Sequence, residues 1–160
     1  FIGVFMKKTS FILVALAMIA MLFGCTLENS LSGNSYLWSQ SYTGSDFGES
    51  DYSDTTVTDN IKLTFKKDGT FINYEYIAIT NLGNHTESEV ISLINSIGYS
   101  VYGISNFYST GLTITGDWTT DGDNLTLSIS GTGVTCTATI DNDKLILTTN
   151  AGKSTIYTKL

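Results

Sequence analysis

The sequence predicts an all-β domain, an eight-stranded antiparallel up-and-down barrel. Three observations lead to this fold class. The 160 residues include no proline, 12% are aromatic and only 14% are charged, and the abundant threonine, tyrosine and isoleucine side chains suit pleated strands. Turn sequences recur at short intervals, and the segments between them alternate between apolar and polar residues. Consecutive hairpins of this kind close naturally into one barrel, and a β-sandwich is the alternative.

The charge of the chain excludes one class of partner. The net charge is −7, and the portion after Cys25 carries six lysines against fifteen acidic residues, a net charge of −9. Such a surface repels phosphate backbones, so nucleic acid is not an expected partner. For the same reason, any attachment to a membrane must be hydrophobic or covalent.

Residues 1–24 have the layout of a secretory signal peptide. Two lysines, Lys7 and Lys8, precede an apolar run from Phe11 to Phe23, which is shorter than the roughly 20 residues that a membrane-spanning helix needs. The natural start of the chain is expected at Met6.

The end of this segment, Leu22-Phe23-Gly24-Cys25, resembles the lipobox of bacterial lipoproteins. The resemblance implies that Cys25 carries a lipid and is acylated by a fatty acid such as palmitate. It also implies that this lipid anchors the protein in the bacterial cell envelope. Thr26 at the next position implies the outer membrane or the cell surface rather than the inner membrane. A secreted protein without lipid is the alternative. Residues 25–35 are polar after the cysteine and are expected to form a flexible tether to a domain at 36–160.

Eight strands are expected in this domain. Hairpin turns are predicted at 66–70, 120–124, 141–144 and 150–153, where Asp-Gly and Asn-rich sequences favour tight turns. The expected strands are 36–42, 57–66, 70–79, 111–119, 124–130, 134–140, 144–149 and 154–159.

One segment between the third and fourth strands has helical spacing. Thr86 and Glu89 match a capping box, and apolar residues then recur at helical intervals until Gly98. We expect one short helix at about 86–97, ended by this glycine, with its apolar stripe covering an open end or flank of the sheet.

Several motifs resemble the bacterial lipocalin-like lipoproteins. The matching residues are Trp38 near the start of the domain, Asp68 to Phe71 in the first predicted hairpin, Gly116, Trp118, Leu125 and Leu127. The resemblance implies a small barrel that binds an apolar molecule without catalysis and without a cofactor.

The face predicted to point into the barrel defines the candidate ligand-binding residues, which are Trp38, Leu63, Phe65, Phe71, Leu112, Ile114, Trp118, Leu127, Ile129 and Cys136. Further residues with the same alternation are Ile61, Leu125, Val134 and Ala138. A filled core without a cavity is the alternative. Cys136 is expected to be an inert, buried thiol.

Other polar residues suggest weaker hypotheses. If Glu75 faced inward, its carboxylate could bind a polar group of a ligand. If it faced outward, it would be a solvated charge, and this is the favoured interpretation. The acidic loop 45–54 suggests calcium, but a solvated loop is the simpler interpretation, and no metal site is predicted. His85 has no catalytic partner nearby in the sequence, so no enzyme is expected.

The alternative function is a surface or periplasmic module that binds a protein or a glycan through acidic loops with tyrosines. The tyrosines considered are Tyr42, Tyr52, Tyr99, Tyr102 and Tyr108.

Overall fold

The computed structural model of the chain describes residues 31–149 and 151–160. Its elements are β1 (Ser35–Thr43), η1 (Gly44–Phe47), η2 (Ser50–Tyr52), β2 (Thr56–Phe65), β3 (Thr70–Asn81), α2 (Glu87–Tyr102), α3 (Phe107–Thr110), β4 (Leu112–Asp121), β5 (Asn124–Ile129), β6 (Thr135–Asp141), β7 (Lys144–Thr148) and β8 (Ser154–Lys159). Each strand begins and ends within two residues of its predicted bounds.

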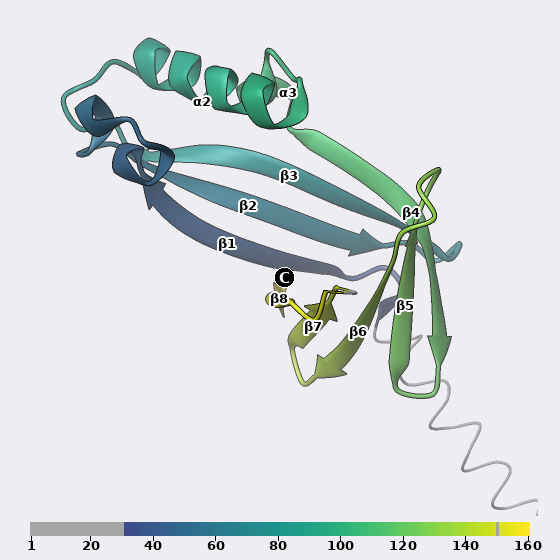
Figure 1. Ribbon diagram of the computed structural model, residues 1–160. Helices are drawn as coiled ribbons and strands as arrows, with labels where there is room; N and C mark the ends of the chain where they lie inside the picture. Colours follow the sequence, from purple (N-terminus) through teal and green to yellow (C-terminus); the bar gives the residue numbers. More distant parts are fainter. Residues whose placement is uncertain (1–30, 150) are drawn as a thin grey trace, which may run out of the picture.

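The strands form one closed antiparallel barrel in which every strand pairs with its neighbours in the sequence, in the order β1 to β8. This confirms the predicted up-and-down barrel, and the sandwich alternative is wrong. The barrel is uneven, because β1, β2 and β3 run well past the short strands β5 to β8 (Figure 1). Closure between β1 and β8 rests on two register pairs, Tyr36 with Lys159 and Leu37 with Thr158.

Helix α2 begins as predicted and ends later than predicted. Thr86 accepts a hydrogen bond from the Glu89 amide in a capping box, but the helix continues through Gly98 to Tyr102 and stops at Gly103, whose φ of 72° is left-handed. Gly98 does not end the helix because the Phe107 side chain packs directly over it, so tertiary contact outweighs the low helix propensity of glycine. The short helix α3 was not predicted.

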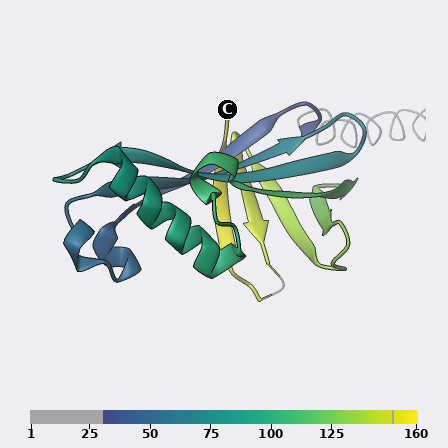
Figure 2. The same ribbon diagram turned by 90° about the horizontal axis from the view of Figure 1, so that it is seen from above.

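The apolar side chains form two separate clusters. The barrel core contains Tyr36, Leu63, Phe65, Phe71, Trp118, Leu125, Leu127, Ala138, Leu145 and Tyr157, together with Leu31. The second cluster contains Val57, Val90, Ile94 and Phe107, with Ile77 and Ile79 packed against them. Because side chains alternate between faces, Val57 shares the inner face of β2 with Leu63 and Phe65. Helix α2 therefore covers the inner face of the extended ends of β2 and β3, as predicted for an open end of the sheet (Figure 2).

The other end of the barrel is closed by the chain before β1. Leu31 is 0% exposed within the barrel core, and the Gly33 amide donates to the Phe65 carbonyl at 2.8 Å. The Phe65 amide donates in turn to the Asn34 carbonyl at 3.0 Å. The prediction of a flexible tether up to residue 35 is thus wrong for residues 31–35, because an apolar side chain there completes the core.

Candidate functional site

A band of polar side chains crosses the barrel between the two apolar clusters. On the inner faces of the long strands, Gln40 of β1 is the register partner of Asp59 of β2. Glu75 and Asn73 of β3 lie opposite Ile61 and Leu63. We call Gln40, Asp59, Asn73, Glu75 and Tyr102 the polar belt.

The carboxyl group of Asp59 lacks a hydrogen-bond partner from the described residues at one of its two oxygens. Its Oδ1 atom is buried and has no hydrogen-bond partner among the described residues. Burial, and then the negative charge of Glu75, raise the pKa of Asp59 to about 6, although a hydrogen bond from the Asn60 backbone acts in the opposite direction. Asn73 Oδ1 is likewise buried without a partner in the described part of the chain.

Glu75 connects the polar belt to helix α2. The phenol of Tyr102 donates to Glu75 Oε1 at 2.7 Å. Burial, and then this hydrogen bond, raise the pKa of Tyr102. The favoured interpretation of Glu75 as an outward, solvated charge is wrong, because its register partners Ile61 and Leu112 belong to the inner face.

The barrel wall is open at the level of the polar belt. Beyond Leu37, β1 has no register partner in β8, and a cleft of about 570 Å³ lies between the two strands. We call it the lateral cleft. It is lined by Trp38, Gln40, Tyr42, Ile61, Lys153, Ser154, Thr155, Ile156 and Tyr157. Its walls therefore combine aromatic rings with a few polar groups, of which Gln40 belongs to the polar belt.

Tyr157 lies between the lateral cleft and the barrel interior. It lines the lateral cleft and also an inner cavity of only about 50 Å³. Burial, and then the charges of Cys136, Glu75 and Asp59, raise the pKa of Tyr157 to about 12. The side chain therefore lies within electrostatic range of both carboxylates of the polar belt.

The predicted interior residues are distributed over four places. Leu63, Phe65, Phe71, Trp118 and Leu127 are buried in the barrel core. Ile114, Ile129 and Cys136 line the inner cavity together with Asn73. Trp38 lines the lateral cleft, and Leu112 packs against the cluster under α2.

The structure also places Val134 and Cys136, which were both expected on the inner face of the barrel. Val134 is 46% exposed and is not an inner-face residue, because β6 begins only at Thr135. Cys136 is a half-buried free thiol. Cys25, the predicted lipidation site, lies outside the described residues.

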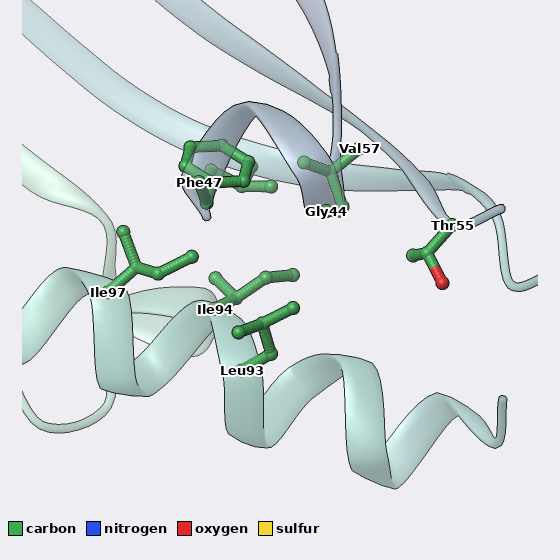
Figure 3. Close-up of a pocket in the computed structure, with 8 residues that line it drawn as sticks. Gly44, Phe47, Thr55, Val57, Leu93, Ile94 and Ile97 are labelled. Atoms are coloured by element: carbon green, nitrogen blue, oxygen red, sulfur yellow. The ribbon is translucent and has the colours of Figure 1, made fainter. Parts of the chain in front are cut away.

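The contact between α2 and the sheet leaves almost no free volume. A pocket of about 10 Å³ remains between Leu93, Ile94 and Ile97 of the helix and the strand residue Val57. Figure 3 shows Phe47 and Val57 on one side of this gap and the helix residues on the other. Helix α2 is thus a packed cover of the barrel end.

The acidic loop has local structural roles. Asp46 accepts hydrogen bonds from the amide and hydroxyl groups of Thr43. Asp54 accepts two from Asn84 and lies 3.7 Å from His85 Nε2. Within residues 31–149 and 151–160, no three side chains of the metal-binding kinds lie close enough together to hold an ion.

The tyrosines named for the binding loops lie on several different elements. Tyr42 lies on β1 and lines the lateral cleft. Tyr52 stacks on His85 with ring centroids 4.1 Å apart. Tyr99 and Tyr102 are exposed near the end of α2.

Three candidate site residues are not among those predicted from the sequence, namely Gln40, Asp59 and Tyr157. The segment Thr56–Phe65 alternates cleanly except at Asp59, where an acidic residue stands in the apolar series. A carboxylate on an otherwise apolar face is a recognisable signal of a site. The register that joins Asp59 to Gln40 could not be read from the sequence.

No family model matches the chain, and no curated protein matches it. None of the helices in the described part of the chain is long and apolar enough to cross a bilayer.

Proposed function

We propose that this chain is a non-enzymatic binding protein of the bacterial cell envelope, held at the membrane by a lipid on Cys25, and that it takes up a small ligand with an apolar body in the lateral cleft. The observation that carries the proposal is the opening between β1 and β8, with its volume of about 570 Å³.

The size and composition of the lateral cleft suit a small organic molecule. Small-molecule sites usually enclose about 300–1,000 Å³ and are mostly apolar, with a few polar groups that orient the ligand. Trp38, Tyr42 and Tyr157 supply aromatic surface here, and Gln40 and Thr155 supply polar groups. The strands that carry these residues are also paired on their other sides, which favours a preformed site.

The ligand is expected in the lateral cleft and not in the centre of the barrel. The inner cavity of about 50 Å³ has room for little more than a water molecule or two. Binding of the ligand inside the lumen would require the core side chains to move apart, and this movement would cost packing energy. The ligand therefore lies between β1 and β8 and not in the lumen.

The place of the protein in the cell is part of the same proposal. The lipobox-like segment ending at Cys25 and the following Thr26 support anchoring at the outer membrane or the cell surface. Lipid attachment is consistent with the strongly acidic remainder of the chain, which an anionic membrane surface would repel.

A second candidate function is supported by the filled core. An interaction module that binds a protein or a glycan needs no cavity, and it needs exposed contact residues. Tyr99 at 64% exposure and Ile156 at 53% are such residues. They lie on α2 and on β8.

Occupancy of the purified protein distinguishes the two functions. The full chain is reconstituted in lipid nanodiscs, and its native and denatured masses are compared, with empty nanodiscs as the blank. A stoichiometric small molecule, released on denaturation and enriched over the blank, supports the binding function. A protein that carries nothing and takes up no small aromatic or alkyl compound overturns it and favours the interaction module.

A further inference from the structure

We infer that the lateral cleft recognises its ligand through a primary ammonium group, which pairs with Asp59 next to Gln40 while the apolar body of the ligand lies against Trp38 and Tyr42. This inference rests on the proposed function and adds the chemical class of the ligand. It is drawn from three features of the cleft.

The first feature is the position of Asp59 next to a residue that lines the cleft. Gln40 and Tyr42 line the cleft, and Asp59 is the direct cross-strand partner of Gln40. On the same inner face, Tyr42 lies opposite Val57, the next inward-facing residue of β2. The charge of Asp59 acts on Tyr42, whose pKa is raised by burial first and by Asp59 second. Asp59 does not itself line the cleft, but it is the neighbour of Gln40, which does, and its charge acts on Tyr42 in the cleft wall.

The second feature is an excess of hydrogen-bond acceptors. Asp59 Oδ1 and Asn73 Oδ1 are buried without partners in the described part of the chain. Glu75 receives one hydrogen bond from Tyr102. A primary ammonium group carries three donors and no acceptor, so it can satisfy the carboxylate without leaving a new acceptor unpaired. A buried acceptor without a partner costs stability.

The third feature is that no lysine or histidine among the described residues forms an ion pair with the polar belt. Within residues 31–149 and 151–160, the ion pair observed joins His85 to Asp54 and involves no belt residue. Lys153 lies on the rim of the lateral cleft but makes no such pair. Asp59 and Glu75 therefore lie in a partly buried region without a counter-charge from the described residues, and a ligand cation is favoured there.

The same features argue against other ligand head groups. An anionic head group would be repelled by Asp59 and Glu75. A neutral alcohol would leave the charge of Asp59 unpaired. A metal ion would need several ligands, and the described residues hold no suitable group of three. The rings of Trp38 and Tyr42 add a further preference for a cation, because aromatic faces attract positive charge.

Three compounds of the same size and shape separate these head groups. Benzylammonium, benzyl alcohol and benzoate are titrated at about pH 7.5 into the full chain in phosphatidylcholine nanodiscs by calorimetry, with empty nanodiscs subtracted. We expect benzylammonium to bind about tenfold or more tighter than benzyl alcohol, since hydrogen bonds to charged groups are worth more than neutral ones. Benzoate should bind more weakly than either.

A variant assigns the preference to Asp59. Asp59→Asn keeps the size of the side chain and should remove the preference, lowering the affinity for benzylammonium about tenfold relative to the affinity for benzyl alcohol. Asp117→Asn is the matched control, because Asp117 is exposed on β4 and its replacement changes the net charge equally. This control should leave both affinities unchanged.

The outcomes separate the inference from the proposed function. If benzyl alcohol binds as tightly as benzylammonium, or if Asp59→Asn leaves the preference intact, the ammonium inference is overturned and the binding function stands. If none of the three compounds binds, and a wider set of small apolar compounds also fails, the proposed function itself is overturned. The comparison of the three compounds on the unaltered chain does not depend on the folding of any variant.

Discussion

The phenol of Tyr102, the last residue of α2, donates a hydrogen bond of 2.7 Å to Glu75 Oε1 on β3. The bond joins the helix that covers the open end of the barrel to β3 of the polar belt. It also uses one of the two Glu75 oxygens. The cover of the barrel and its polar interior are thus directly connected.

Removal of this phenol should loosen the end of α2. Tyr102→Phe keeps the ring, which contacts Phe107, and deletes only the donor. We expect the free energy of unfolding to fall by about 1 kcal/mol, the usual scale for one partly exposed hydrogen bond. Thermal unfolding followed by circular dichroism measures the change. Tyr99→Phe on the same helix is the control, and equal effects of the two variants would contradict a specific role for the bond.

The carboxyl group of Asp59 should make stability depend on pH. Its pKa is raised from 3.8 to about 6 in the folded protein, so the folded state keeps a proton that the unfolded state releases at lower pH. Stability should therefore fall as the pH rises from about 4 to about 6. Glu75, Tyr42, Tyr102 and Tyr157 are the titratable groups whose pKa or charge is coupled to Asp59, and the tyrosines stay neutral in this range.

Asp59→Asn tests this sign directly. The variant should be more stable than the unaltered chain at about pH 7 by about 1 kcal/mol, a value reduced for the partial exposure of the group, and the difference should vanish near about pH 4. Unfolding by urea at several pH values measures it. A variant that is less stable at about pH 7 would show that the carboxylate is instead held by favourable contacts.

A side chain at Gly98 should disturb the contact of α2 with α3. A Cβ atom there would collide with the Phe107 side chain, and Phe107 is one of the buried residues of the cluster under the helix. We expect Gly98→Ala to destabilise the protein by about 2 kcal/mol, as overpacking does, despite the better helix propensity of alanine. Ser96→Ala, at an exposed position of α2, serves as the control. A stabilised Gly98→Ala variant would mean that helix propensity dominates at this position.

Leu31 should behave as a core residue although it precedes the first strand. Leu31→Ala is expected to cost about 3 kcal/mol, within the range for buried leucines, because the side chain is 0% exposed in the barrel core. Leu160→Ala is the matched control, since Leu160 is 64% exposed, and it should cost little. Equal unfolding temperatures for the two variants would contradict the closed end described above.

The strands and the start of α2 could be predicted because local signals determine them. Asp-Gly turns, alternation of apolar residues and the capping box of Thr86 act within a few residues. The end of α2 could not, since Gly98 is an ordinary stop signal and is overridden by Phe107, nine positions later. The buried position of Leu31 likewise depends on contacts with distant strands.

The candidate site was only partly foreseen. Trp38 was predicted as an interior residue and lines the lateral cleft. The cleft itself arises because β1 and β8 pair through two register pairs only, a property of barrel closure that no local pattern encodes. The inward position of Glu75 was also undetermined by the sequence, because both faces of β3 carry polar and apolar residues.

The location of the bound ligand is the central claim, and the two tryptophans of the chain report on it separately. Trp38 lines the lateral cleft, whereas Trp118 is buried in the barrel core, with its indole N–H donated to the Lys66 carbonyl at 3.2 Å. The chain is labelled with 5-fluorotryptophan, its two fluorine signals are assigned with Trp38→Phe, and benzylammonium is added to saturation. We predict that the Trp38 signal shifts while the Trp118 signal stays in place. Movement of the Trp118 signal alone, or binding that moves neither signal, would contradict a ligand site between β1 and β8.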